Sequence, residues 1–325
     1  MKRALSPHEV MQRLAPGTPI SGEALAEQLG VTRAAVWKQI AALRALGLPI
    51  EARTNVGYSL PWPVELLDAT RIAQLSGEAG PPVQVHWALD STQDELARTL
   101  QAQPDLAVVL AEQQTGGRGR RGHAWRSPPC MGVYLSCLKR FAGGPATLSG
   151  LSIAAGVCAA QALAELGVPD LRLKWPNDLL ARGAKLAGIR IEVQGEYDVP
   201  CTAPVGVGVN LRLPDDLHES VSQPVIDLAT LCDGTPPGRN AIAAALIRHL
   251  RAGLLGFERA GLAPFLADFA RLDALAGQPL RLDGAGVPNE GTGRGINERG
   301  ALRVEHAGSV TLIESSQVSV RLATN

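Results

Sequence analysis

Three arginines lie between three glycines in the run Gly117-Arg118-Gly119-Arg120-Arg121-Gly122. The run follows residues 107–111, an apolar stretch typical of a strand, so we expect it on a loop at a strand end. It also fits the G-x-G-x-x-G dinucleotide fingerprint, which needs a helix after its last glycine. Pro128 and Pro129 exclude that helix, and no Lys-Ser/Thr pair completes a phosphate-binding P-loop. The run predicts a loop that holds a phosphate or carboxylate, with a solvated basic loop as the alternative.

Length and charge indicate a small basic unit attached to a larger body. A chain of 325 residues suggests about two domains, and 46% hydrophobic residues suffice for a sizeable core. Residues 1–62 hold seven basic and four acidic side chains, a net charge of +3, whereas the whole chain has a net charge of zero. This asymmetry favours a nucleic-acid-binding module joined to a separate functional unit.

Cysteine usage and hydropathy favour a cytoplasmic protein. The five cysteines are odd in number and form no C-x-x-C pair, so we expect reduced core residues rather than metal ligands or disulfides. The N-terminus has no signal-peptide core, and no stretch reaches the ~18 apolar residues of a membrane span. We therefore expect no membrane partner.

The N-terminal segment predicts a helix-turn-helix domain. A capping box at residues 6–9 starts one helix, Ser21 starts a second over 22–29, and Thr32 caps a third over 33–46. Residues 51–53 and 58–60 can pair as a wing, and prolines at 61–63 mark the end of the domain. A helical hairpin docked on the body is the alternative. The outer face of the third helix and its cap supply the predicted DNA-binding residues: Thr32, Arg33, Ala34, Trp37 and Lys38.

The rest of the chain predicts an α+β body followed by a small β unit. Strands are expected at 83–89, 107–111, 133–138, 171–175, 186–193 and 203–211, and helices after Ser91 and at 148–166, 240–260 and 264–272. Residues 214–238, rich in proline and acidic side chains, predict a mobile loop. Five short strands at 279–282, 292–296, 301–306, 309–314 and 318–322 predict a small barrel.

Further motifs carry candidate chemistry, each with a structural alternative. Asp178, in the motif 174–178, suits Mg²⁺ bridging phosphates or else an Asx-turn. Lys185 precedes an apolar strand, where a solvated charge is the alternative. Gly206 and Gly208 open one strand face to a flat ligand or else bend the strand. Trp125 suits base stacking or the core.

Together these motifs resemble the bifunctional biotin–protein ligases that also act as biotin repressors. The resemblance covers essentially the whole chain, and rests on residues 21–60, 90–92, 117–122, 174–178, 185–188 and 206–210. It implies a winged helix-turn-helix domain at 1–62, a mixed α/β, class II synthetase-like catalytic domain at 63–275 and an SH3-like β-barrel at 276–325.

The resemblance also implies an activity and its residues. The chain would activate biotin with ATP and Mg²⁺ to biotinyl-5′-AMP, transfer biotin to a lysine of a biotin carboxyl carrier protein, and repress biotin synthesis at operator DNA as a ligand-promoted homodimer, with no permanently bound cofactor. Lys185, Arg118 and Arg120 would be catalytic. The biotin site would comprise Ser91, Thr92, Gln114, Gly117, Arg118, Arg120, Arg121, Lys185, Gly206 and Gly208, and the adenylate site Trp125, Asn177 and Asn210.

Two departures and two rival functions remain. Gln93 stands where the family commonly has asparagine, and Asn55 stands near a usual wing glycine, although asparagine tolerates φ > 0 better than most residues. A DNA-binding regulator that senses its ligand without catalysis would not need Arg118, Lys185 and Asp178 together. A lipoate or octanoate ligase would need an apolar tunnel where Ser91 and Thr92 offer polar groups.

Overall fold

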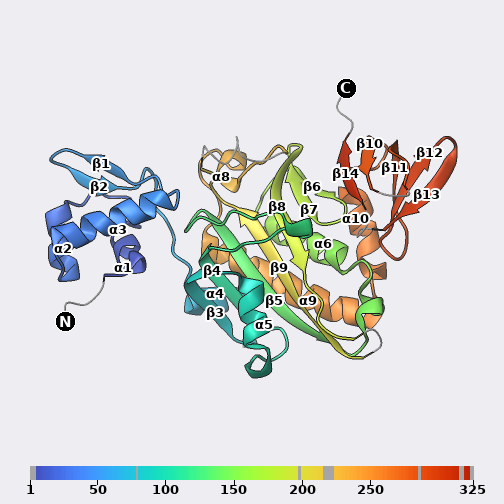
Figure 1. The fold of residues 1–325 in the computed structure, drawn as a ribbon, viewed down its shortest axis with the longest axis horizontal. Helices are drawn as coiled ribbons and strands as arrows, with labels where there is room; N and C mark the ends of the chain where they lie inside the picture. The colour runs from blue at the N-terminus through green and yellow to red at the C-terminus, as the bar shows by residue number, and fades with distance from the viewer. Residues whose placement is uncertain are drawn as a thin grey trace.

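The computed structural model describes residues 5–77, 80–196, 199–214, 223–284, 287–314 and 318–322. Its N-terminal domain, blue in Figure 1, packs three helices under a two-stranded hairpin. The elements are α1 (Pro7–Leu14), α2 (Gly22–Leu29), α3 (Arg33–Ala45), β1 (Glu51–Arg53) and β2 (Gly57–Ser59). The Ser6–Glu9 capping box begins α1, and the hydroxyls of Ser21 and Thr32 cap α2 and α3. The predicted helix starts and the hairpin are confirmed.

Backbone contacts fix the position of the hairpin. Tyr58 and Ile20 exchange two backbone hydrogen bonds, of 2.8 and 2.9 Å, which tie β2 to the turn before α2. Gly57 has φ +117°, and a Cβ there would lie 2.2 Å from the carbonyl oxygen of Ile20. No larger residue fits that position, so the hairpin depends on this glycine. Asn55 has φ +62°, which asparagine tolerates well.

A seven-stranded mixed sheet forms the body, in the order β3-β4-β5-β9-β8-β7-β6. Only β3 and β4 pair in parallel; the other neighbours are antiparallel. The strands are β3 (Val83–Leu89), β4 (Val108–Gln114), β5 (Gly132–Phe141), β6 (Leu171–Lys174), β7 (Asp178–Ala181), β8 (Ala184–Ile191) and β9 (Cys201–Asn210). All predicted strands appear, and β7 is additional.

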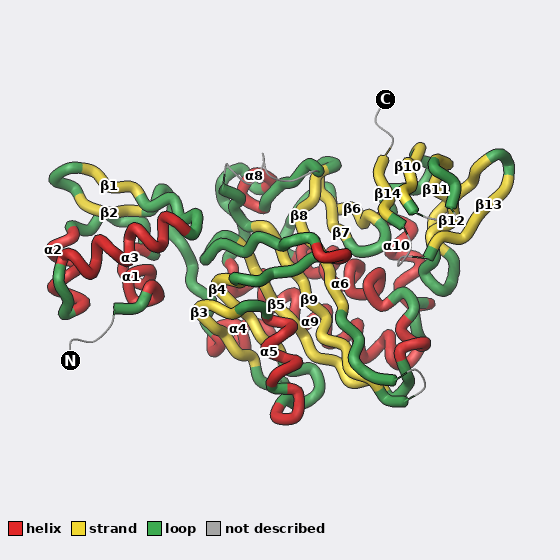
Figure 2. The backbone as a smooth tube through the Cα atoms, viewed as in Figure 1, coloured by secondary structure: helices red, strands yellow, loops and turns green. Residues whose placement is uncertain are grey.

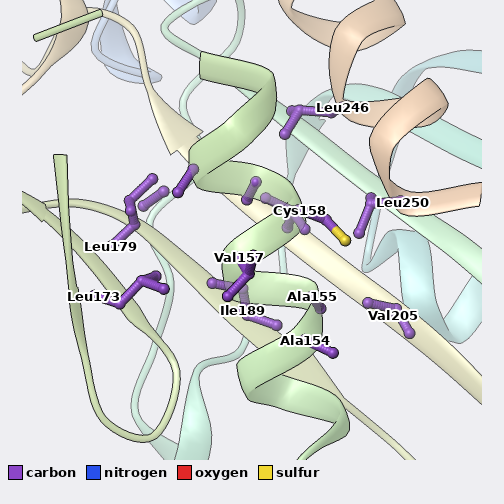
Figure 3. Packing of buried hydrophobic residues seen from close by; sticks show 14 of the residues in the cluster. Ala154, Ala155, Val157, Cys158, Leu173, Leu179, Ile189, Val205, Leu246 and Leu250 are labelled. Atoms are coloured by element: carbon purple, nitrogen blue, oxygen red, sulfur yellow. The ribbon is translucent and has the colours of Figure 1, made fainter. Parts of the chain in front are cut away.

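Helices α6 (Leu151–Glu165) and α9 (Arg239–Ala260) bury one face of this sheet. The other helices of the body are α4 (Ala69–Ser76), α5 (Thr92–Arg98), α8 (Leu228–Leu231) and α10 (Leu266–Leu272), with 3₁₀ turns η1 (Leu100–Ala102), η2 (Arg120–Gly122), η3 (Pro145–Leu148) and η4 (Ala263–Phe265). Helix α6 is apolar all round because it lies between the sheet and α9. In Figure 3 its residues Val157 and Cys158 lie between Ile189 of the sheet and Leu246 and Leu250 of α9. Helix α4 was not predicted.

The opposite face of the sheet carries α5 and the arginine-glycine loop. Figure 2 shows the chain between β4 and β5 crossing in front of the sheet, with the short helix η2 over β8 and β9. The loop folds back on itself, since Gly119 N donates to His123 O (2.7 Å) and Trp125 N donates to Gly117 O (2.9 Å). The predicted loop at a strand end is confirmed, and it covers one face of the body.

The C-terminal segment forms an antiparallel sheet in the order β13-β12-β11-β10-β14. Its strands are β10 (Pro279–Asp283), β11 (Glu290–Ile296), β12 (Leu302–His306), β13 (Ser309–Ile313) and β14 (Ser319–Leu322). In the described part of this sheet the two edge strands do not pair with each other, so the sheet stays open. The five predicted strands are confirmed, whereas the barrel is not.

The segment predicted as a mobile loop is only partly described. Residues 215–222 lie outside the described residues, and the remainder includes the short helix α8. Lys185 also pairs with Val225 as an isolated bridge, so part of the segment pairs with the start of β8. Residues 223–238 therefore contain regular structure that the sequence did not predict, and the mobility of the segment 214–238 stays a prediction.

The N-terminal domain touches the body through side chains. Its core of α1, α2 and α3 continues into Cys130 and Met131, which precede β5. His8 stacks on Trp87 of β3 with 5.3 Å between ring centroids. The five cysteines are free, and four of them are buried, as predicted. Among the described residues, no helix is both long and apolar enough to cross a membrane.

Candidate functional site

The loop and the sheet face beneath it line a pocket with a cavity volume of about 60 Å³. The predicted residues that line it are Ser91, Thr92, Gln114, Arg118, Arg120, Trp125, Asn177, Lys185, Gly206 and Gly208. They come from the start of α5, the end of β4, the loop, the β6–β7 turn, β8 and β9. The structure thus gathers most of the predicted site in one place.

One end of the pocket is polar and held rigidly. Ser91 caps α5 by accepting from the amide of Gln93 (3.2 Å). The Oε1 atom of Gln114 accepts from the amide (3.0 Å) and hydroxyl (3.2 Å) of Thr92. That hydroxyl lies 2.7 Å from Ser136 Oγ on β5. These contacts place donors and acceptors together in fixed positions, which suits a small polar ring more than a hydrocarbon chain.

Gln93 is a buried part of the same wall. Its Nε2 donates to the carbonyl oxygens of Arg190 (3.0 Å) and Pro204 (2.8 Å). A Cβ on Gly206 would lie 3.2 Å from Gln93 Cδ. The glutamine therefore fills the space above Gly206 and ties α5 to β8 and β9.

The indole of Trp125 covers the next stretch of the pocket floor. A Cβ on Gly208 would lie 2.7 Å from the indole, and one on Gly188 would lie 3.0 Å from it. Within the described residues, Trp125 Nε1 is buried without a hydrogen-bond partner. The space over Gly208 is thus taken by the protein's own indole, and the predicted contact of the strand glycines with a flat ligand stays a prediction.

Lys185 stands beside this indole and is not a solvated charge. Its Nζ lies 2.8 Å from Asp178 Oδ1 and 5.4 Å from the centroid of the Trp125 ring. Both partners of the ion pair are largely buried, with side-chain exposures of 16% and 14%. Asn210 is buried and donates to the backbone oxygen of Lys185 (3.3 Å), so it supports β8 from behind. The pair gives the pocket a fixed ammonium group.

Arg120 brings a second cation to the pocket. Its Nη1 donates to Asn177 Oδ1 (3.4 Å), and Asn177 Nδ2 donates to Ile189 O (2.9 Å). Burial lowers the pKa of Arg120, and the nearby Asp178 carboxylate opposes that shift. A partly desolvated guanidinium favours an anionic ligand, since such a ligand restores its lost solvation.

Arg118 points to carboxylates of the protein. Its Nη2 donates to Asp94 on α5 and lies 3.4 Å from Glu192 Oε1, just beyond β8. The hydrogen bond with Asp94 raises the pKa of Arg118, although burial opposes it. Neither acid was predicted from the sequence. Two acidic residues in the first turn of α5 were the only signal, and helix dipoles explain such residues equally well.

Four predicted site residues do not line this pocket. Gly117 lies against backbone, where a Cβ would be 2.4 Å from Trp125 O, and Arg121 is exposed. Asn210 and Asp178 do not line the pocket, but both contact Lys185: Asn210 bonds its backbone oxygen and Asp178 pairs with its ammonium group. Their predicted ligand contacts stay predictions.

The donor set fits Mg²⁺ only together with a phosphate ligand. No group of three or more His, Cys, Asp or Glu side chains suited to a metal occurs in the described ranges. Asp178 supplies one carboxylate, with Oδ1 engaged by Lys185. Because Mg²⁺ commonly takes one or two carboxylates plus substrate phosphates and water, a single carboxylate is compatible with it.

A separate surface on α3 carries the predicted DNA-binding residues. Arg33, Ala34, Trp37 and Lys38 are all exposed, and so is the cap Thr32. Trp37 is 66% exposed, the highest value among the exposed large apolar side chains. Val36, Ile40 and Leu43 are buried on the opposite side of the helix. The first turns of α3 therefore present a polar and aromatic surface to solvent.

Comparison with known proteins matches these two sites to two families. Residues 8–59 match the HTH domain, and residues 87–210 match the biotin/lipoate A/B protein ligase family. The bifunctional ligase/repressor BirA of Escherichia coli is 38% identical over 324 residues, 99% of both chains. The protein of that name in Bacillus subtilis is 33% identical over 74% of this chain and 73% of its own. The biotin–[acetyl-CoA-carboxylase] ligase of Mycobacterium tuberculosis is 34% identical over 69% of this chain and 83% of its own.

Solved structures share the fold. The biotin protein ligase from Aquifex aeolicus, in complex with biotin and ATP, superposes with a TM-score of 0.63 at 23% identity. The match covers 74% of this chain and 99% of that chain. The fold of the body therefore belongs to a known architecture.

Proposed function

Because this chain belongs to the family of BirA, the bifunctional ligases and repressors, we propose that it biotinylates an acceptor protein and represses transcription. It is an ATP-dependent biotin–protein ligase. The biotin carboxylate attacks the α-phosphate of ATP to give biotinyl-5′-AMP and pyrophosphate. A lysine amine of a biotin carboxyl carrier protein then attacks the mixed anhydride, forming an amide and releasing AMP.

One observation carries the ligase half of this function. A rigid polar end, at Thr92, Gln114 and Ser136, opens into the same pocket as Lys185 and Arg120. The first group suits the ureido ring of biotin and the second suits its carboxylate joined to a phosphate. A long apolar acyl chain would leave the polar end unsatisfied, which disfavours lipoate and octanoate.

The residue roles follow from where charge develops. Lys185 and Arg120 stabilise the phosphoryl oxygens in the transition state, and such preorganised donors are the main source of catalysis in reactions of this kind. Trp125, Asn177 and Asn210 form the adenylate side, with Asn210 acting through β8. The loop around Gly117, Arg118 and Arg121 closes over the anhydride and excludes water, which would otherwise hydrolyse it.

Mg²⁺ enters this proposal with ATP. When bound, it would neutralise phosphate charge and orient the leaving pyrophosphate. Asp178 is the residue of the described site suited to hold it, through the oxygen that Lys185 leaves available. The variant Asp178→Asn is expected to raise the Mg²⁺ concentration that gives half-maximal adenylation. An unchanged Mg²⁺ dependence would assign Asp178 to Lys185 alone.

The repressor half rests on the exposed surface of α3. A domain of net charge +3 binds DNA weakly as one copy, so occupancy of an operator depends on dimers that span two half-sites ~34 Å apart. We propose that the adenylate-bound body favours this dimer. We also retain as proposals the domain limits 1–62, 63–275 and 276–325, the SH3-like character of the last domain, and a cytoplasmic location.

Two assays test the two halves separately. Biotin transfer to an acceptor lysine, followed by mass shift of the acceptor, tests the ligase. Operator binding across a protein-concentration series, with and without biotin and ATP, tests the repressor. If the affinity for the operator does not depend on biotin and ATP, the proposed repressor function is wrong. Ligand-dependent DNA binding without biotin transfer would favour a purely regulatory sensor.

A further inference from the structure

We propose that Asp94 and Glu192 form a catch that holds the arginine-glycine loop closed through Arg118. The inference deepens the proposed function, since it assumes that this loop covers the biotin and adenylate pocket. It assigns Asp94 as a positioning residue for retention of the adenylate. Its effect is exerted through Arg118 and the loop rather than on the reacting atoms.

The contacts form a chain of alternating charges. Arg118 Nη2 donates to Asp94 and approaches Glu192 Oε1 at 3.4 Å, and the same Glu192 oxygen pairs with Arg190. Two positive and two negative groups sum to zero, so closure leaves no uncompensated charge beside the pocket. Their side-chain exposures lie between 24% and 42%, which places the chain of charges at the rim of the pocket.

The acidic partners stand on rigid parts of the body. Asp94 lies in the first turn of α5, where Ser91 caps the helix and Gln93 is bonded to the backbone of β8 and β9. Glu192 directly follows the last residue of β8. Arg118 belongs to the loop, whose backbone bonds at Gly119 and Trp125 join the loop to itself. The catch therefore joins the arginine-glycine loop to α5 and to the end of β8.

This arrangement changes what Arg118 contributes. Arg118 is paired with two carboxylates at the rim of the pocket, whereas Lys185 has one carboxylate partner and lies deeper, as does Arg120 beside Asn177. Arg118 then acts mainly by keeping the loop in place. Because an exposed ion pair is weak, its loss should speed loop opening about two- to fivefold.

The test compares Asp94→Asn with Glu95→Gln. Both changes remove one negative charge from the first turn of α5, but Glu95 pairs with Arg98 and does not touch the loop. The first readout is tryptic cleavage of the ligand-free full-length protein at loop arginines 118–126, followed by mass spectrometry. The second is the dissociation rate of preformed biotinyl-5′-AMP. Both rates should rise about two- to fivefold in Asp94→Asn and stay at the wild-type value in Glu95→Gln.

Loop cleavage at wild-type rate in Asp94→Asn would overturn the catch, and so would an equal increase in Glu95→Gln. Faster cleavage with unchanged adenylate dissociation would overturn its role in retention. Glu192→Gln is a second variant that should move both rates in the same direction even if Asp94→Asn folds poorly. The cleavage assay needs no ligand, so a wild-type protein that makes no adenylate would reject the proposed function while leaving the catch testable.

Discussion

Lys185 Nζ lies 2.8 Å from Asp178 Oδ1, and this ion pair joins β8 to the first residue of β7 at the edge of the pocket. The pair keeps an ammonium group beside the Trp125 indole, in a position that a flexible lysine would not otherwise hold. A transition state with charge on phosphoryl oxygens would meet a donor that needs no rearrangement.

Removing this ammonium should slow adenylation while leaving the fold intact. Lys185→Ala is expected to lower the single-turnover rate of adenylate formation by ~10²–10³, the usual effect of losing one preorganised donor. The control is Arg182→Asn, which removes an exposed cation from the β7–β8 turn; asparagine tolerates the φ of +49° there. Near wild-type rates in Lys185→Ala would place the phosphoryl site elsewhere.

The contact between Gly208 and Trp125 predicts a packing effect on stability. Gly208→Ala places a methyl group 2.7 Å from the indole and should lower the free energy of unfolding by about 1–3 kcal/mol, the usual cost of overpacking. Urea denaturation measures this loss. Gly256→Ala on α9 is the matched control, because the added methyl group would lie 3.9 Å from its nearest neighbour, and this variant should not be destabilised. If Trp125→Ala relieves the defect in the double variant, the indole is the cause.

The exposed face of α3 predicts separable DNA and ligase functions. Trp37→Ala should weaken operator binding by about 1–3 kcal/mol, the usual value of a specific base contact, and Lys38→Ala should reduce the salt dependence by about one phosphate. Both should form adenylate at the wild-type rate. Arg13→Ala, an exposed residue of α1, removes the same charge as Lys38→Ala. If Lys38→Ala and Arg13→Ala lose operator affinity equally, the net charge of the domain, and not this face of α3, determines DNA binding.

Lys174 predicts a pH-dependent stability effect. Burial lowers the pKa of Lys174, although the Asp178 carboxylate opposes the shift. The folded state therefore loses this proton at lower pH than the unfolded chain, whose lysines titrate near ~10.4. The cost of burying the charge is fully present below the folded pKa and falls as pH rises through it.

Lys174→Met should accordingly raise Tm at pH 7, and the gain should shrink as pH approaches about 10. The methionine would face Leu173, Ile153 and Phe269 in a small cavity. Thermal unfolding monitored by circular dichroism between pH 7 and 10 measures the difference. A variant that is less stable at pH 7, or whose gain widens with pH, contradicts this account of Lys174.

Local signals made the N-terminal domain predictable. The caps at Ser6, Ser21 and Thr32 act within three residues, so the sequence contains both partners of each hydrogen bond. Strand β7 has only four residues, pairs with a strand on each side and has a bulge near Leu179. None of these features produces a periodic pattern of apolar residues in the sequence. Residues 223–238 look like a loop in composition, yet Asp227 caps α8.

The sequence predicted which residues form the site, but not which residues they contact. Motif spacing identified Arg118, Trp125 and Lys185, but it did not identify the acids that Arg118 contacts, which lie far away in sequence. Asp94 precedes Arg118 by 24 residues, and Glu192 follows it by 74. The buried pair of Arg239 and Glu112, which holds the segment after the N-terminal domain, was missed for the same reason. Tertiary pairs of this kind are determined by the folded sheet.

The identity of the adenylate tests the central claim most directly. The full-length protein is incubated with ATP, Mg²⁺ and an equimolar mixture of biotin and lipoate, and the bound nucleotide is identified by mass spectrometry. The account predicts biotinyl-5′-AMP, with pyrophosphate released in equal amount, because the polar end at Thr92, Gln114 and Ser136 fits a ureido ring. Lipoyl-5′-AMP as the main product, or no adenylate at all, would contradict it.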